Sequence, residues 1–220
     1  MKTVCVFFAL LCAVVGSATM VMGSTTEIEL LESRLVDDPT NISLLMQLGE
    51  LYHSLAVDGE RDAVQKADEM FAEILRIDPG NAEALAWRGS IYTLKARDAW
   101  FPITKLVYVY RGIGIMRRAV ELAPDDIAVR MVRANTSMAL PGFFGQLNTA
   151  IRDLEHLLAL HEEDPEGFSN AVLADIYLAL GKAREKAGDD KGARECWQKV
   201  ISLVPGSDEA KEAMELLQGL

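Results

Sequence analysis

Cysteine is scarce in this chain of 220 residues, and two of its three cysteines, Cys5 and Cys12, lie near the start. So few cysteines exclude a small disulfide-stapled domain and a zinc site with several cysteine ligands. Proline and glycine are also few, at 7 and 16 residues, which excludes collagen-like or low-complexity sequence. Because half of its residues are hydrophobic and a quarter are charged, the chain can bury a core.

Basic residues are outnumbered, with 22 Lys and Arg against 33 Asp and Glu and a formal net charge of −11. A nucleic-acid-binding protein needs a basic face to neutralise phosphates, so this charge argues against a nucleic-acid partner. The basic residues gather in the middle of the chain, where residues 88–133 carry a net charge of +5 between acidic flanking blocks. Such a segment would attract an anionic ligand or an acidic partner.

The first residues have the layout of an export signal. Lys2 precedes an apolar stretch over residues 3–15, and several small residues follow. This order is typical of a secretory signal peptide, which we place at residues 1–23. Because no charge occurs between Lys2 and Glu27, an uncleaved membrane anchor formed by residues 3–23 is the alternative. In either case we expect an exported protein, periplasmic or secreted if cleaved and membrane-anchored if not.

Five of the seven prolines recur at intervals of 40, 45, 41 and 40 residues: Pro39, Pro79, Pro124, Pro165 and Pro205. Proline cannot continue a helix, so each of them marks a helix end. Between the prolines, apolar residues recur at three- and four-residue intervals, and no alternation of period two supports a strand. A repeat with a period of about 20 to 50 residues is the signature of stacked supersecondary units.

The last unit carries the most specific pattern. Its key positions are Tyr177, Leu180, Gly181, Gly188, Ala193, Trp197 and Pro205. This order resembles the tetratricopeptide repeat (TPR), a helical hairpin of about 34 residues. Gly181 and Ala193 are small enough for two antiparallel helices to approach closely, and Gly188 suits a turn with positive φ. Earlier units match less fully, and the resemblance extends over almost the whole chain after the signal.

The resemblance implies an all-α fold, a right-handed α-solenoid of about four TPR-like hairpins with a leading helix and a C-terminal capping helix. We expect this solenoid to cover residues 24–220. Its expected segments are a partial unit at 27–39, full units at 41–79, 81–124, 126–165 and 167–205, and a cap at 207–218. The chain is similar to exported bacterial TPR proteins with an extended middle hairpin.

Extra residues relative to the TPR pattern enter between the two helices of three hairpins. In the middle hairpin they predict long helices over 82–99 and 103–122, interrupted near Pro102. In the next hairpin they predict a stiff loop over 140–145. Because the turns of a solenoid align along one edge, we expect these insertions to form a single rim.

Arginine and aromatic residues, which dominate binding hot spots, concentrate in the same region. The candidate binding residues are Arg97, Trp100, Phe101, Arg111, Arg130, Arg133, Phe143 and Phe144. The structural alternative is that the aromatic side chains fill the core and the basic ones pair with acidic neighbouring repeats.

No motif predicts a catalytic residue, a metal site or a cofactor. His156 and His161 are five residues apart and diverge on a helix, which disfavours a shared metal ion. Gly112 and Gly114 form only half of a dinucleotide-binding fingerprint, without a preceding strand. Cys196 is expected to be a small buried hydrophobic residue. We therefore expect a protein that is not an enzyme.

Two functions remain. The first is a protein–protein interaction scaffold or adaptor in the cell envelope, which binds another protein, or a further copy of itself, on its concave face or on the inserted rim. The alternative is a small-ligand-binding or solute-transporter accessory protein, with an anionic ligand held by the middle Arg and aromatic residues. The scaffold predicts that Arg97, Trp100 and Arg130 lie along an open surface, whereas the ligand site predicts that they converge on an enclosed cavity. Membrane contact is expected only through the N-terminal anchor.

Overall fold

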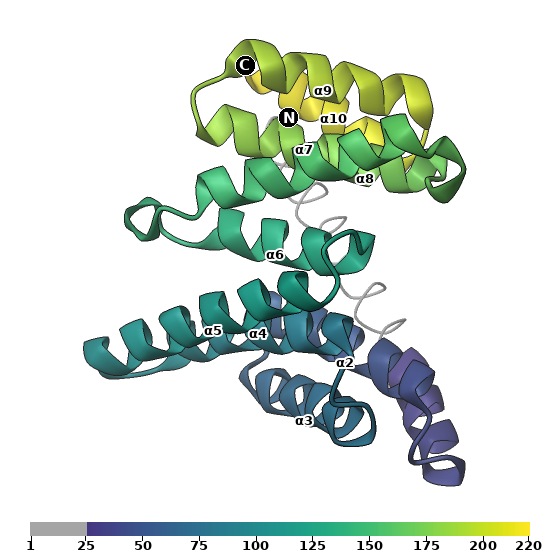
Figure 1. The fold of residues 1–220 in the computed structure, drawn as a ribbon, viewed down its shortest axis with the longest axis vertical. Helices are drawn as coiled ribbons and strands as arrows, with labels where there is room; N and C mark the ends of the chain where they lie inside the picture. Colours follow the sequence, from purple (N-terminus) through teal and green to yellow (C-terminus); the bar gives the residue numbers. More distant parts are fainter. Residues whose placement is uncertain (1–25) are drawn as a thin grey trace, which may run out of the picture. The chain divides into compact units, whose positions relative to one another are not determined.

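The computed structural model describes residues 26–220, and within that range the chain is helical and contains no strand (Figure 1). The predicted signal or anchor at residues 1–23 lies outside the described residues. The chain divides into two compact units, one ending at Ala84 and one running from Leu85 to Leu220. None of the helices in the described range is both long enough and apolar enough to span a bilayer.

The first unit consists of a helix over 26–37 followed by the hairpin of α2 (Ile42–Val57) and α3 (Arg61–Ile77). Almost all of α4 (Ala82–Asp98) belongs to the second unit, which continues with α5 (Pro102–Leu122), α6 (Ile127–Ala139), the short helix η1 (Gly142–Phe144), α7 (Leu147–Glu163), the short helix η2 (Pro165–Gly167), α8 (Asn170–Lys186), α9 (Asp190–Leu203) and α10 (Asp208–Gly219). The long middle helices were predicted almost to the residue. The expected stiff loop over 140–145 contains η1.

Local signals set the helix starts. Six helices of the described range begin after a side chain that accepts a hydrogen bond from the backbone N–H three residues on: Asn41, Asn81, Asp126, Ser169, Asp189 and Ser207. Each such cap satisfies a backbone donor that the helix leaves without an internal partner. Pro102 stands at the first position of α5, where its missing N–H costs nothing.

Three side chains join the leading helix of the first unit to the hairpin that follows it. The hydroxyl of Tyr52 on α2 donates to a carboxylate oxygen of Glu32, and Lys66 Nζ donates to the Tyr52 oxygen over 3.3 Å. Burial raises the pKa of Tyr52, and the hydrogen bond to Glu32 raises it further. The leading helix is therefore fixed by a specific polar contact as well as by apolar packing.

One cluster of buried apolar residues in the second unit lies between α6, α7, α8 and α9. Leu154 and Leu157 of α7 are buried against Ile176 and Leu180 of α8. A second cluster surrounds Trp197 of α9 and reaches α10. The turn between α8 and α9 contains Gly188 at φ +81°, as the TPR pattern requires.

Candidate interaction surface and adjoining cleft

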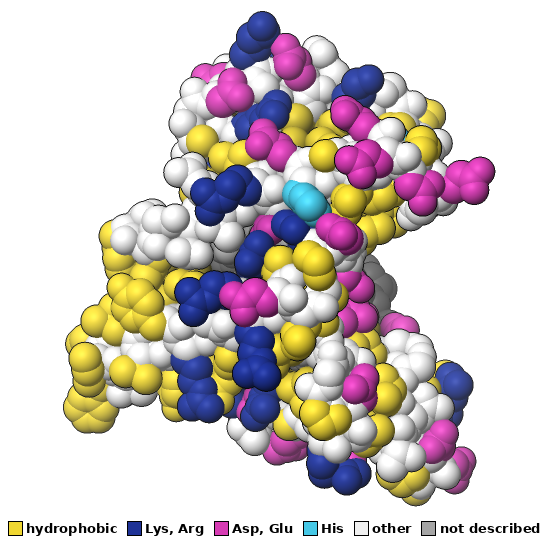
Figure 2. All heavy atoms as spheres, viewed as in Figure 1, with side chains coloured by type: hydrophobic (Ala, Val, Ile, Leu, Met, Phe, Trp, Pro, Cys, Tyr) yellow, Lys and Arg dark blue, Asp and Glu magenta, His cyan; other side chains and the backbone are white. Residues whose placement is uncertain are grey.

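Exposed apolar side chains gather at the free end of the α4–α5 hairpin and on η1 beside it (Figure 2). Six large hydrophobic residues there expose more than half of their surface: Trp100, Phe101, Ile103, Val107, Tyr110 and Phe143. We call these six residues the rim. Trp100, in the turn between α4 and α5, is 88% exposed. The hydrophobic effect disfavours leaving such side chains in water, so a contiguous exposed apolar patch of this kind is unusual on a protein surface.

Contacts between aromatic rings connect η1 to α5. The ring of Phe144 meets that of Tyr110 edge-on at a centroid distance of 5.8 Å, and it is tilted against the ring of Phe143 at 4.4 Å. Gly145 follows at φ +67°, which lets the chain leave η1 and enter α7. Within the second unit, the extra residues of the middle hairpin and those of the hairpin after it therefore contribute side chains to one surface. The expectation of a shared rim holds for these two insertions.

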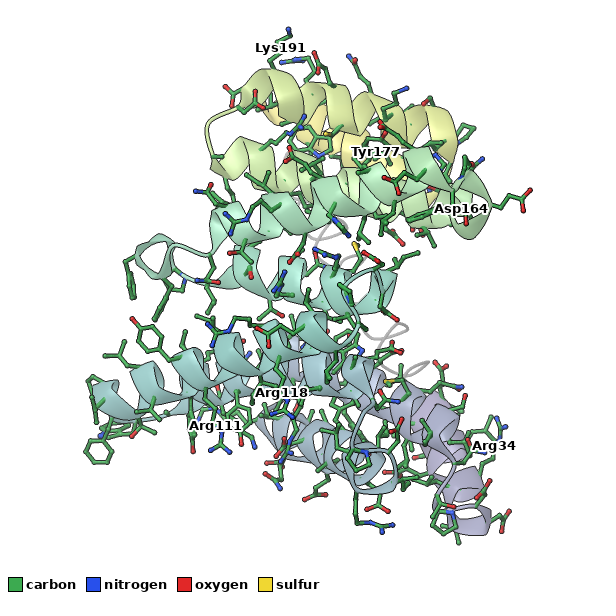
Figure 3. The ribbon with its side chains drawn as sticks, viewed as in Figure 1. Arg34, Arg111, Arg118, Asp164, Tyr177 and Lys191 are labelled. Carbon is green, nitrogen blue, oxygen red and sulfur yellow. The ribbon has the colours of Figure 1, made fainter. Side chains whose placement is uncertain are left out.

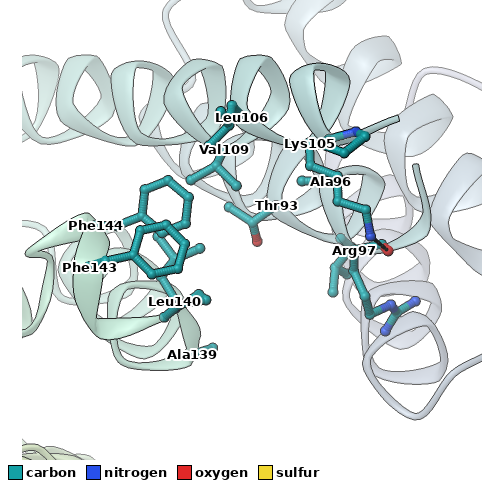
Figure 4. A pocket seen from close by; sticks show the side chains of 13 residues that line it. Thr93, Ala96, Arg97, Lys105, Leu106, Val109, Ala139, Leu140, Phe143 and Phe144 are labelled. Atoms are coloured by element: carbon teal, nitrogen blue, oxygen red, sulfur yellow. Dashed lines mark hydrogen bonds between the residues drawn. The ribbon is translucent and has the colours of Figure 1, made fainter. Parts of the chain in front are cut away.

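A cleft of about 580 Å³ opens next to the rim, between the end of α4, the start of α5 and the loop after α6 (Figure 4). Its walls are mostly hydrocarbon, and Thr93, Arg97 and Lys105 are the polar side chains that line it. Figure 4 shows Phe143 and Phe144 on one side of the cleft and the two cationic side chains at the opposite end.

The basic residues singled out from the sequence do not converge on this cleft. Arg97 lines it, but its guanidinium pairs with Asp98, with 2.8 Å between Nε and Oδ1. The carboxylate of Asp98 raises the pKa of Arg97. The guanidinium of Arg111 lies 4.5 Å from the centre of the Tyr92 ring in a cation–π contact, and Figure 3 shows it on the same side of α5 as Arg118.

The two arginines of α6 have a structural role. Arg130 and Arg133 both donate to the carboxylate of Asp153 on α7, at 2.7 Å and 2.5 Å from its Oδ1. The side chain of Asp153 is only 1% exposed, so this is a buried ionic cluster between two helices. These two arginines thus pair with a carboxylate, as the structural alternative held, but the carboxylate belongs to their own expected unit (126–165) and not to a neighbouring repeat.

Of the eight candidate residues, Arg97, Phe143 and Phe144 line the cleft, and Trp100 and Phe101 lie beside it on the rim. Sequence reasoning missed Ile103, Lys105 and Val107. For the two apolar residues the available signal was their spacing, because Ile103, Val107 and Tyr110 recur at helical intervals and so form one apolar stripe on α5.

The two histidines considered as metal ligands have separate partners. His156 contacts Asp125 at 2.7 Å, whereas His161 packs edge-on against the ring of Phe168. Within residues 26–220, no three side chains of the metal-binding types lie close enough to hold an ion. Cys196 is buried as predicted, at 3% exposure, and its burial raises the pKa of the thiol.

Comparison with known proteins identifies the fold. No protein-family model and no curated protein matches the chain. The solved structure of TTC0263, a thermophilic TPR protein of Thermus thermophilus, aligns with a TM-score of 0.69 over 93% of this chain and 96% of that chain, at 16% identity. The chain has the tetratricopeptide-repeat fold.

Less close alignments to TPR structures include MamA, with a TM-score of 0.48 at 21% identity over 81% of each chain. YrrB, described as a TPR protein with an unusual peptide-binding site, aligns with a TM-score of 0.46 at 20% identity over 91% of this chain and 88% of that one.

Proposed function

We propose that this TPR chain is a non-enzymatic interaction scaffold of the cell envelope, which binds another protein through the rim. The exposed aromatic and aliphatic side chains of the rim carry the proposal. Apolar area removed from water contributes about 25 cal/mol per Å², so covering Trp100, Ile103 and their neighbours would supply substantial binding free energy. Aromatic residues at the centre of an apolar patch are also the usual hot spots of protein interfaces.

Several parts of the proposal rest on sequence alone. Export depends on the signal-like residues 1–23, and the repeat units are proposed at 41–79, 81–124, 126–165 and 167–205. A TPR fold supports a binding role because stacked helical hairpins present extended surfaces on which partners dock. Function still has to be argued from the site, and here that site is the rim.

An anionic ligand held by the whole Arg and aromatic cluster is the weaker candidate. Asp153 already engages Arg130 and Arg133, and the guanidinium of Arg111 lies against the Tyr92 ring. A ligand would have to displace Asp153 to recruit Arg130 and Arg133. The geometry therefore favours the scaffold.

The test is native mass spectrometry of the protein purified gently from its own cell envelope, with and without the double substitution Trp100→Ser and Ile103→Ser. The mass of the bare chain also reports whether residues 1–23 are removed. We expect a protein-sized adduct on the unsubstituted chain and at least about a thirtyfold weaker complex for the double variant, as for the loss of hot-spot residues.

The matched control is Met214→Ser, which removes an exposed apolar side chain from α10, away from the rim. This substitution should leave the complex intact. A complex that survives the rim substitutions would overturn the rim as the binding surface, and a self-complex lost with the rim would identify the partner as a second copy.

A further inference from the structure

One end of the cleft is lined by apolar side chains. Leu106 and Val109 of α5 lie across from Phe144, and Leu140 of the loop after α6 lies beside Phe143 and Phe144 (Figure 4). At about 580 Å³, the cleft lies within the range of about 300 to 1,000 Å³ that is usual for small-molecule sites. Water in contact with such walls gains little hydrogen bonding, so a hydrocarbon chain would displace it favourably.

The opposite end of the cleft carries positive charge. Lys105 Nζ donates to the backbone oxygen of Arg97 over 3.1 Å and makes no ion pair with any carboxylate in residues 26–220. The neighbouring Arg97 is paired with Asp98. Thr93 is also occupied, because its hydroxyl donates to the backbone oxygen of Ser90. Of the two cationic side chains that line the cleft, Lys105 is therefore the one that forms no ion pair with a carboxylate of residues 26–220.

We propose that this cleft binds an amphiphilic anion, with its hydrocarbon chain between Phe144 and Val109 and its carboxylate on Lys105. This inference goes beyond the scaffold function, because the cleft and the rim share only Phe143. A single ammonium group at the end of a hydrocarbon-walled cleft matches a single-headed anion with one apolar chain. A polar anion would find no further partners along the walls, and a neutral hydrocarbon would leave Lys105 unused.

The ligand site and the rim are separable by substitution. Trp100, Ile103 and Val107 belong to the rim and do not line the cleft, whereas Lys105 and Leu140 line the cleft and are not rim residues. The double substitution Trp100→Ser and Ile103→Ser should therefore leave ligand binding unchanged. Failure of the proposed scaffold function and failure of this inference give different results.

The experiment is calorimetric titration of the purified chain with dodecanoate below its micelle concentration. We expect one molecule bound per chain. Dodecyltrimethylammonium, which has the same hydrocarbon chain and a cationic head, should bind at least about tenfold more weakly, since it loses a charge-assisted hydrogen bond. Butyrate, which keeps the carboxylate but has a short chain, should not bind measurably.

Two substitutions locate the site. Lys105→Gln should weaken dodecanoate binding about tenfold or more, whereas Lys191→Gln, on the exposed start of α9 (Figure 3), should have no effect. Leu140→Trp should fill the apolar end and abolish binding, with circular dichroism and the melting temperature confirming that the variant folds. Because Lys105→Gln leaves the apolar lining intact, it keeps the test decisive should Leu140→Trp not fold.

Three results would overturn the inference. The first is no dodecanoate binding at millimolar concentration. The second is that the chain binds dodecanoate and dodecyltrimethylammonium equally tightly, or that Lys105→Gln binds dodecanoate as tightly as the unsubstituted chain does. The third is binding only to micelles or to phosphatidylglycerol vesicles, together with loss of that binding in the rim variant, which would assign a membrane-facing role to the rim instead.

Discussion

The indole of Trp197 occupies the space in which a side chain at residue 181 would begin. An ideal Cβ on Gly181 of α8 would lie 2.2 Å from Nε1 of Trp197 on α9. Trp197 is fully buried, and its Nε1 has no hydrogen-bond partner among the described residues. Packing alone therefore holds the ring, and it can do so only because residue 181 is glycine.

The contact predicts that Gly181→Ala destabilises the second unit. A single methyl group would force the helices apart or drive the indole from its place, at a cost of about 2 to 3 kcal/mol of unfolding free energy. For a chain of this length the melting temperature should fall by about 5 to 10 °C, and Gly181→Leu should be worse. Thermal unfolding followed by circular dichroism measures the effect.

A second glycine provides the matched control. Gly114 lies inside α5, and a Cβ built there would have no neighbour within 4 Å. Gly114→Ala should therefore raise the unfolding free energy by about 0.5 to 1 kcal/mol, because alanine loses less conformational freedom in a helix. Equal melting temperatures for the two alanine variants would contradict the role assigned to Gly181.

The buried cluster on Asp153 predicts a large loss of stability for Asp153→Leu. The substitution would leave Arg130 and Arg133, whose side chains are 11% and 17% exposed, without their carboxylate. Breaking a buried pair in this way costs about 3 to 5 kcal/mol. Glu121→Gln, which removes the exposed partner of Arg117, should change stability by less than about 1 kcal/mol. Urea unfolding compares the two, and similar midpoints would show that the cluster is not structural.

The fold was predictable because its signals are local. The helical spacing of apolar residues and the pattern around Gly181 and Trp197 each lie within one hairpin, where sequence distance approximates distance in space, and each regularly spaced proline acts locally by ending a helix. The same holds for Gly188, whose positive φ follows from its place in a turn.

The roles of the arginines were not predictable in the same way. Arg130 and its partner Asp153 are 23 residues apart and sit on different helices, so sequence alone does not indicate whether they meet. Exposure of the rim posed a related difficulty, because aromatic side chains on a long helix fill a core wherever another helix covers them. Ile103 and Trp100 are exposed because no other segment of the described second unit covers that end of the hairpin.

Cys196 should be inert in the folded protein. It is buried on α9, and burial raises the pKa of its thiol, so little reactive thiolate forms near neutral pH. With Cys5 and Cys12 changed to serine, a disulfide reagent at pH 8 should label the native chain far more slowly than the urea-unfolded chain. Equal rates in the two states would show that the α8–α9 hairpin opens readily.

Stability should also fall as the pH is lowered, through His53 on α2. Burial lowers the pKa of His53 to about 4, whereas a histidine in an unfolded chain titrates near 6.5. Between these values the unfolded chain binds a proton that the folded chain does not. The contribution of a neutral His53 is therefore intact above about pH 6.5 and is progressively lost as the pH falls toward 4.

Replacing His53 with glutamine removes this titration. As the pH falls from 7.5 to 5, the melting temperature of the unsubstituted chain should decrease more than that of His53→Gln. The additional loss should correspond to about 1 to 3 kcal/mol of unfolding free energy. Carboxylates that titrate in the same range affect both proteins alike, so they cancel in this comparison. A difference that stays constant with pH would show that His53 binds its proton equally well in the folded and unfolded chains.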